Sequence, residues 1–345
     1  MSTIILTGVT GQDGSHMADY LLKHTEHKIY GGARRLSVPN HKNIEHINSS
    51  RFELINLDLN DSHSIEKNIA IIKPDYFINF AAQSFVGASW DYPRQTFETN
   101  ATAVLDMLES LRKHSPDCRF YNAGTSEEFG DVEYTPQDEK HPLKPRSPYG
   151  ASKAAARHIV KVYRESYNLF AIQGWLFNHE GVRRGEEFVT RKITKSAARI
   201  KKTIEEKIKF APLELGNIDA ERDWSDAEDF VDGVWKMINA KDPKEYILSS
   251  GECHTIRSFV ENAFRALDID GYWTGAGIEE KYIHTPSGEI LVKINPKYYR
   301  PAEVNLLCGD STRARENLGW EPKTSFSGLV KKMARKDLQE QTKND

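Results

Sequence analysis

Residues 4–19 read IILTGVTGQDGSHMAD, and this stretch decides the fold of the chain. The apolar run Ile4–Leu6 is typical of a buried parallel strand, and Ser15–His24 carries apolar residues at helical spacing. Between them, the spacing G-x-x-G-x-x-G is formed by Gly8, Gly11 and Gly14. A strand, a glycine-rich turn and a helix N-terminus form an anion site, because backbone N–H groups can approach a pyrophosphate there. The stretch therefore predicts dinucleotide binding, and an ordinary strand-to-helix turn is the alternative.

The composition is that of an ordinary globular protein. A chain of 345 residues is near the upper limit for one core, which predicts one large domain or two interleaved domains. The net charge of −3 gives no reason to expect a nucleic acid or an anionic membrane as partner. No apolar stretch is long enough to span a bilayer and no basic region precedes Ile4, so we expect a cytoplasmic protein.

The cysteines and histidines give no pattern of a metal site. Cys118, Cys253 and Cys308 are scattered without a C-x-x-C pair, which favours a reducing compartment over a disulfide framework or a zinc site. His24 and His27 are the closest histidine pair, and a third ligand is lacking nearby. We therefore expect no metal.

The first half of the chain alternates apolar runs with helical patterns, which is typical of a parallel, doubly wound sheet. After the first strand, the strands expected are His27–Gly31, Phe52–Leu57, Tyr76–Ala81, Arg119–Ala123 and Phe170–Trp175. The further helices expected are Ser62–Ile72, Thr96–Lys113, Ser152–Tyr167 and Phe188–Lys209. These assignments predict the α/β class, with a Rossmann sheet and a second, smaller α/β domain.

The weakening of this alternation after residue 177 suggests where the domains divide. Residues 1–177, joined by a returning segment around 216–248, are expected to form the dinucleotide-binding domain. The remainder of 178–345, mainly 178–215 and 249–345, is expected to form the substrate-binding domain.

The end of the second strand indicates which dinucleotide is bound. An acid there would bind a ribose 2′-hydroxyl, but Arg34 and Arg35 occupy this place, and two guanidinium groups favour the 2′-phosphate of NADP. A surface arginine pair is the alternative. Asp58 and Leu59, after the third strand, fit an adenine pocket in which the carboxylate accepts from the exocyclic amine. A turn cap is the alternative for Asp58.

Tyr149 and Lys153 have the spacing Y-x-x-x-K, which places both side chains on one face of a helix. The ammonium is expected to lower the pKa of the phenol, so that the phenol can take a hydroxyl proton as a hydride leaves the same carbon. The spacing alone is common. Here, however, Thr125 and Glu127 follow the fifth strand, at the sheet edge where ligands bind.

Glu127 distinguishes two kinds of chemistry. An enzyme that only moves a hydride at one carbon needs no carboxylate there, whereas one that also removes a proton beside a new ketone does. A solvated turn acid or an N-cap partner is the alternative role for Glu127.

These motifs together resemble a known family. The T-G-x-x-G-x-x-G opening, the Y-x-x-x-K pair and the threonine after the fifth strand resemble the extended short-chain dehydrogenase/reductases. Among these, the chain is most similar to the GDP-mannose 4,6-dehydratase family. The matching runs, which extend nearly from end to end, are Gly8–Gly14, Ala81–Ser84, Gly124–Gly130, Asn178–Glu180, Arg183–Gly185, Phe188–Thr194, Leu215–Trp224, Arg300–Val304 and Leu318–Phe326.

The resemblance implies a redox-neutral lyase that holds NADP tightly. Tyr149 would accept the proton of the sugar C4 hydroxyl while a hydride passes from C4 to the cofactor. Glu127 would remove the C5 proton, water would leave from C6, and the stored hydride would return to C6. Thr125 and Ser126 would orient the sugar, and the product would be a 4-keto-6-deoxy sugar.

The resemblance also implies binding roles by position. The residues that would bind NADP are Gly8, Thr10, Gly11, Gln12, Asp13, Gly14, Arg34, Arg35, Asp58, Leu59, Ala82, Gln83, Ser84, Tyr149, Lys153, His179 and Arg184. Those that would bind the nucleotide sugar are Ser84, Ser126, Asn178, Val189, Lys192, Arg222, Arg300 and Glu303. For Arg222 and Arg300, surface salt bridges are the alternative. Asn100 is expected to brace backbone between strands.

Three departures from the family's pattern bear on the assembly and on the substrate. Residues 36–40 differ from a loop that in the family reaches toward a neighbouring subunit, so a homodimer is expected beside the implied homotetramer. Phe85 replaces a histidine, and Gly181-Val182 replaces Ser-Pro, so a related GDP-sugar such as a GDP-heptose is an alternative substrate. The same scaffold could also serve a nucleotide-sugar 4-epimerase or reductase. It could even serve a non-catalytic NADP-binding protein, against which the intact Tyr149 and Lys153 pair argues.

Overall fold

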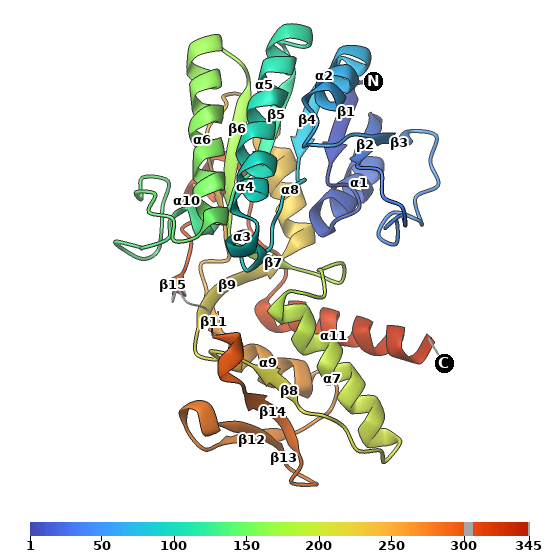
Figure 1. The fold of residues 1–345 in the computed structure, drawn as a ribbon, viewed down its shortest axis with the longest axis vertical. Helices are drawn as coiled ribbons and strands as arrows, with labels where there is room; N and C mark the ends of the chain where they lie inside the picture. Colours follow the sequence, from blue (N-terminus) through green and yellow to red (C-terminus); the bar gives the residue numbers. More distant parts are fainter. Residues whose placement is uncertain (300–305, 344–345) are drawn as a thin grey trace.

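A seven-stranded sheet organises the computed structural model, which describes residues 1–299 and 306–343 (Figure 1). Its order is β10-β6-β5-β4-β1-β2-β3, and every neighbouring pair is parallel. The strands are β1 (Thr3–Thr7), β2 (Lys28–Ala33), β3 (Phe52–Asn56), β4 (Tyr76–Asn79), β5 (Arg119–Ala123), β6 (Ala171–Leu176) and β10 (Ile247–Leu248). The predicted doubly wound sheet is confirmed, with several strand ends displaced by one or two residues.

Helices cover both faces of this sheet. Since successive side chains of a strand point to opposite faces, Ile4 and Leu6 enter one core with α1 and α8, whereas Ile5 enters the other core with α2, α5 and α6. These helices are α1 (Gln12–His24), α2 (Ser62–Ile72), α5 (Ala103–His114), α6 (Pro148–Tyr167) and α8 (Ala227–Ile238). Within the described part of the chain, no helix is both long and apolar enough to cross a membrane.

The segment before α5 is less regular than its sequence suggests. The single helix expected over Thr96–Lys113 is divided into α4, a π-helical turn η1 and α5. Asn100 lies in that turn and bonds the backbone of Gln83 through both polar atoms of its amide. The additional short elements are α3 (Ala88–Asp91), α4 (Pro93–Phe97) and η1 (Glu98–Thr102).

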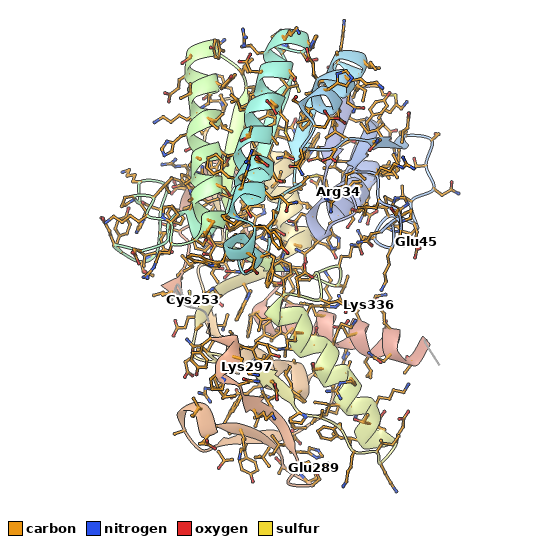
Figure 2. The ribbon with its side chains drawn as sticks, in the orientation of Figure 1. Arg34, Glu45, Cys253, Glu289, Lys297 and Lys336 are labelled. Atoms are coloured by element: carbon orange, nitrogen blue, oxygen red, sulfur yellow. The ribbon has the colours of Figure 1, made fainter. Side chains whose placement is uncertain are left out.

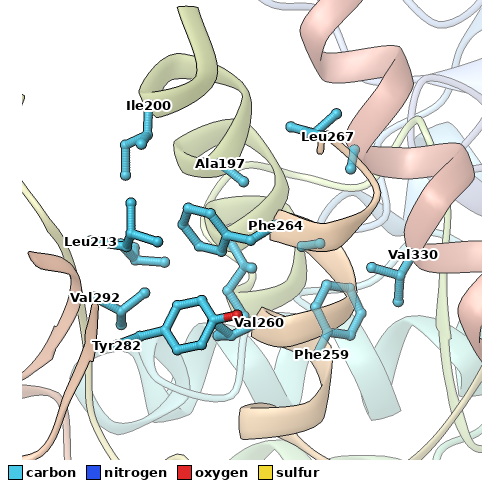
Figure 3. Close-up of a cluster of buried hydrophobic side chains, with 14 of the residues drawn as sticks. Ala197, Ile200, Leu213, Phe259, Val260, Phe264, Leu267, Tyr282, Val292 and Val330 are labelled. Carbon is cyan, nitrogen blue, oxygen red and sulfur yellow. The ribbon is translucent and has the colours of Figure 1, made fainter. Parts of the chain in front are cut away.

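A second core lies beyond the carboxyl ends of the sheet's strands (Figure 1). Helices α7 and α9 pack against a sheet of order β12-β13-β14-β8, and α11 packs on α7 and α9; Figure 3 shows Phe264 and Tyr282 meeting between α9 and this sheet. The elements are α7 (Val189–Glu205), α9 (Ile256–Arg265), α11 (Phe326–Lys343), β8 (Leu213–Leu215), β12 (Gly271–Thr274), β13 (Lys281–His284) and β14 (Ile290–Ile294), with the 3₁₀ turns η3 (Gly277–Glu279) and η4 (Pro296–Tyr298).

A small third sheet, in which β9 pairs with β7, β11 and β15, joins the two cores. From β9 the chain returns to the large sheet through α8 and β10. The segment 312–320 also belongs to the first core, although we expected it in the second domain: the Trp320 indole is buried there and donates to Asp229 O at 2.8 Å. The elements are β7 (Asn178–Glu180), β9 (Glu221–Asp226), β11 (Cys253–Thr255), β15 (Leu306–Leu307) and α10 (Thr312–Leu318).

Candidate active site

A cavity of about 590 Å³ opens at the carboxyl ends of the central strands, between the large sheet and the second core. One wall comes from the loops after β4, β5 and β6, which is where ligands bind in doubly wound sheets. The other wall comes from the second core, where Figure 2 labels Lys297. The arrangement can therefore hold an extended ligand between the two walls.

The candidate catalytic residues Thr125, Glu127, Tyr149 and Lys153 all line this cavity. Thr125 follows β5 and caps the 3₁₀ turn η2 (Ser126–Glu128), with its hydroxyl accepting from the Glu127 N–H at 3.3 Å. The same hydroxyl is bonded to the Tyr149 phenol. Lys153, one turn along α6, donates to Ala123 O at 2.9 Å. The spacing of these residues thus brings them together as predicted, and their chemical roles stay predictions.

The protonation equilibria correct one expectation. Burial raises the pKa of Tyr149 well above its ordinary value, Glu127 and Glu128 add to this rise, and the bond from Thr125 opposes it. The expected lowering by Lys153 is not found in this structure. Burial instead lowers the pKa of Lys153 to about 8, because the ammonium is removed from water.

The glycine-rich turn forms a tight cradle beside these residues. Gly8 has a φ of +69°, and a Cβ there would lie 2.7 Å from Ala81 N; a Cβ on Gly14 would lie 2.2 Å from Gly8 O. Both positions therefore require glycine, and Gly11 N donates to Gly8 O at 2.9 Å to close the turn. The start of α1 then faces the cavity through Asp13.

Asp13 and His179 form an ion pair across the cavity floor. His179 Nε2 lies 3.0 Å from an Asp13 carboxylate oxygen, and the Gln12 amide bonds both residues. Burial raises the pKa of Asp13, but the nearby His179 outweighs burial and holds it well below its usual range. Arg184 also lines the cavity; its guanidinium pairs with Glu180 at 2.9 Å.

A second cavity, of about 490 Å³, lies at the end of β2. Arg34 and Arg35 line it together with Thr10, whose carbonyl accepts from the Asn43 amide at 3.0 Å. Arg34 directly follows β2 and is labelled in Figure 2. Two arginines in a cavity beside the glycine-rich turn can bind a phosphate on the adenosine half of a dinucleotide.

Seven predicted cofactor residues are not among those that line either cavity: Gly8, Gly11, Gln12, Gly14, Asp58, Leu59 and Gln83. Asp58 accepts from the Asn60 N–H at 3.0 Å, which is the alternative role of a turn cap, and Leu59 is buried. Ala82 and Ser84 line the large cavity, but Gln83 between them bonds Phe85 O instead. The cofactor-binding roles of these seven residues stay predictions. The bonds of Asn100 to Gln83 agree with the predicted bracing role.

Most predicted sugar-nucleotide residues line the large cavity: Ser84, Ser126, Asn178, Val189, Lys192 and Arg222. Asn178 Oδ1 is buried without a hydrogen-bond partner among the described residues, so it can accept from a ligand. Lys192 donates to Glu214 O at 2.8 Å and lies 3.9 Å from the Tyr298 ring centroid. Arg300 and Glu303 lie outside the described residues.

Several lining residues had no signal in the sequence. Trp90 and Tyr298 are each 51% exposed although they border the cavity, and isolated aromatic residues resemble ordinary surface positions. Phe85, one of the departures from the family's pattern, lines the cavity and packs edge-on against Phe188. Lys297 and Tyr299 were missed as well, whereas Leu215, Gly216 and Asn217 begin the family-matching run Leu215–Trp224 but were given no role. No cluster able to hold a metal occurs in the part of the chain that the structure describes.

The comparisons with known proteins agree with this geometry. The model of the family described as GDP-mannose 4,6 dehydratase matches residues 5–333. A GDP-mannose 4,6 dehydratase of Drosophila melanogaster is 42% identical over 99% of this chain and 87% of its own length. A GDP-mannose 4,6-dehydratase of Sinorhizobium fredii is 42% identical over 97% of this chain and 96% of its own.

Solved structures support the fold at lower identity. A dTDP-glucose 4,6-dehydratase of Streptomyces venezuelae superposes with a TM-score of 0.82 at 20% identity, covering 99% of this chain and 98% of its own. A UDP-glucose 4-epimerase of Thermotoga maritima gives 0.79 at 22% identity, covering 99% of each chain. At these identities the similarity shows the architecture alone.

Proposed function

Because the chain belongs to the GDP-mannose 4,6-dehydratase family, we propose that it removes one water from GDP-mannose and forms GDP-4-keto-6-deoxymannose. The observation that carries this proposal is one cavity bordered by both a phenol, Tyr149, and a separate carboxylate, Glu127. Oxidation at one carbon and proton removal at the next need these two groups in one site. Thr125 bonds to both of their segments and orients the sugar between them.

The residues present fit NADP. The cradle at Gly8 and Gly14 leaves room only for backbone beside a pyrophosphate, and Arg34 and Arg35 line the cavity for a 2′-phosphate. His179 and Arg184 border the same groove as Lys153. When bound, this cofactor supplies the acceptor that takes hydride from C4 and the donor that returns it to C6.

The proton transfers belong to the protein. Tyr149 takes the C4 hydroxyl proton as the C4–H bond breaks, which leaves a ketone that acidifies the C5 hydrogen. Glu127 takes the C5 proton and passes it to the C6 hydroxyl, which leaves as water; when hydride reaches C6, C5 regains a proton that balances the one Tyr149 took from the C4 hydroxyl, so both side chains return to their starting states. Lys192 and Arg222 bind the diphosphate, and Asn178 accepts from the ligand through its unpartnered oxygen.

The direct test is incubation of the protein and NADP with GDP-mannose, followed by mass spectrometry. A product lighter by one water, with no net change in NADP, is expected; unchanged GDP-mannose would contradict the proposal. Because Phe85 borders the cavity, a GDP-heptose is the second substrate to assay. Water loss from the heptose alone would move the assignment to that sugar.

The arginines after β2 are expected to decide the choice of cofactor. In Arg34→Ala/Arg35→Ala, the dissociation constant for NADP should rise by about 10- to 10²-fold, since charged hydrogen bonds to the 2′-phosphate are lost. NAD binding should change little, and calorimetry with both dinucleotides measures the difference. Arg94→Ala, a substitution at an exposed arginine paired with Glu98, is the matched control. Equal weakening for both dinucleotides would refute a 2′-phosphate contact.

NADP binding is expected to weaken as the pH rises through about 8. Burial lowers the pKa of Lys153 to about 8, so the ammonium is present below that pH and is lost above it. The dissociation constant should then rise by up to about tenfold per pH unit. Calorimetry from neutral to alkaline pH measures this dependence. Lys153→Arg keeps its charge and should give a flatter curve, and a flat curve for the wild-type protein would contradict the assignment.

We expect a homodimer or a homotetramer. Apolar side chains are exposed on neighbouring helices of the large sheet: Phe97 on α4, Leu105 on α5 and Val162 on α6. A second copy that covered them would remove this surface from water. Light scattering of the purified protein measures the assembly, and a monomer at micromolar concentration would contradict it.

A further inference from the structure

Two consecutive glutamates follow β5, and their side chains lie in different environments. Glu127 borders the large cavity, whereas the Glu128 side chain is fully buried. Glu128 therefore takes no part in the proton transfers described above. A fully buried carboxylate is costly unless it is paired and hydrogen-bonded, so its partners indicate what it does.

Glu128 closes the turn that carries Thr125 and Glu127. Its Oε1 accepts from the Thr125 N–H at 2.9 Å, and the Thr125 hydroxyl caps the same turn in return, which forms a capping box. Glu127 lies between the two residues of this box. The direction of the Glu127 side chain thus depends on a turn whose conformation the Glu128 hydrogen bond stabilises.

The same carboxylate fastens this turn to α6. Arg157, one turn after Lys153, donates from Nε to Glu128 Oε2 at 2.5 Å, and its guanidinium lies 3.4 Å from the Trp175 ring centroid. Gln173 on β6 donates through one amide nitrogen to Glu128 Oε1 at 3.1 Å and to Lys153 O at 2.9 Å. Glu128 is therefore bonded to the strand and to the helix that border the site.

Two glycines, Gly124 and Gly150, allow the turn after β5 and helix α6 to pack in close contact. A Cβ on Gly124 would lie 2.7 Å from both Glu128 Oε1 and Arg157 Nη2, and a Cβ on Gly150 would lie 2.6 Å from Glu127 O. Gly150 directly follows Tyr149, so the backbone beside the phenol packs against the backbone of Glu127. Gly124, before the turn, packs in the same way against the side chains of Glu128 and Arg157. A displacement of Glu128 would therefore move the segment that carries Glu127 and the segment that carries Tyr149.

We propose that the buried Glu128–Arg157 pair is a positioning unit that sets the distance between the Glu127 carboxylate and the Tyr149 phenol. The proposal rests on the function proposed above. Misplacing a catalytic group by about 1 Å can cost about 10²-fold in rate, so a pair that never touches the ligand can still govern turnover.

Glu128→Ala tests this unit, and Asp337→Ala is its matched control. Asp337 is equally buried and pairs with Arg191 at 2.8 Å, but this pair joins α7 to α11 away from the catalytic residues. For Glu128→Ala, kcat for water loss from GDP-mannose should fall about 10²-fold while KM stays within about threefold. For Asp337→Ala, kcat should stay within about threefold at temperatures where the variant is folded.

The rate of deuterium exchange into C5 of the substrate distinguishes a positioning role from a merely structural one, because loss of a structural contact alone would leave this rate unchanged. In Glu128→Ala this exchange should slow as much as kcat, because Glu127 takes that proton. The charge-free variant Glu128→Gln/Arg157→Gln keeps an acceptor for the Thr125 N–H and guards against failure to fold. Its kcat should recover to within about tenfold of the wild-type value. Equal losses of kcat in Glu128→Ala and Asp337→Ala, or an unchanged kcat in folded Glu128→Ala, would overturn the proposal.

Amide hydrogen exchange separates this proposal from the proposed function. The Thr125 N–H should exchange at least about tenfold faster in Glu128→Ala than in the wild-type protein, whatever the substrate is. If the wild-type protein leaves GDP-mannose unchanged, the proposed function fails. If the Thr125 amide stays protected in Glu128→Ala, the proposal of a positioning unit is refuted, and the proposed function is not affected.

Discussion

Glu127→Gln is expected to lower the rate of water loss from GDP-mannose by roughly 10²- to 10⁴-fold, because the amide cannot take the C5 proton. Gln is nearly the same size and keeps the turn after β5, so NADP and nucleotide binding should change little. The first half of the reaction should survive: with substrate deuterated at C4, label should still pass to the cofactor. Product mass and label transfer, measured in one assay, separate the two steps.

The result also decides between reaction classes. A 4-epimerase or a reductase acts at C4 alone, so its turnover would be nearly intact in Glu127→Gln. Glu187 is another carboxylate that borders the cavity, and Glu187→Gln tests it as a competing base. Loss of water release in Glu187→Gln, with Glu127→Gln active, would transfer the role. Glu133→Gln, which alters an exposed acid paired with Lys144, is the control.

Tyr149→Phe is expected to abolish the reaction at an earlier step, by roughly 10²- to 10⁴-fold. The C4 hydroxyl then has no proton acceptor, so label from C4 should not reach the cofactor and no water should leave. Since burial raises the pKa of Tyr149, the wild-type rate of label transfer at saturating NADP should increase with pH as the phenolate population grows. That dependence should disappear in Tyr149→Phe.

The matched control for Tyr149→Phe lies on the same helix. The hydroxyl of Tyr163 donates to Glu109 on α5, remote from the cavity lining, and Tyr163→Phe removes an equivalent atom. Its label transfer should stay within about threefold of the wild-type rate. If Tyr149→Phe keeps full label transfer, another group must accept the C4 hydroxyl proton and the proposed mechanism is wrong.

Local spacing, read together with the family resemblance, was sufficient to predict which candidate catalytic residues share one cavity. Tyr149 and Lys153 are four residues apart on α6, so they share one helix face, and Thr125 follows β5 and Gly124, so it lies at the carboxyl edge of the sheet. Asp58 and Gln83 were assigned to ligand contact by position; their side chains bond nearby backbone groups, and their contact with a ligand stays a prediction. Short polar side chains after strands have both uses, and spacing does not distinguish them.

Long-range contacts were beyond the reach of local patterns. Tyr298 borders the cavity because residues 296–298 pack closely against Gly216, where a Cβ would lie 2.4 Å from Tyr298 O. Likewise, Glu128 and Arg157 read as ordinary charged residues until α6 and the turn after β5 are placed together. The pairing of a buried charge is a property of the tertiary structure.

The return of α8 and β10 to the large sheet has a consequence for protein engineering. Residues 1–177 expressed as a separate fragment would leave the outer edge of β6 unpaired and would uncover Tyr121 and Ile172, which belong to the core with α8. Such a fragment is expected to aggregate. Permuted or split versions should instead be cut at exposed loop tips such as 287–289, where a nick severs neither core.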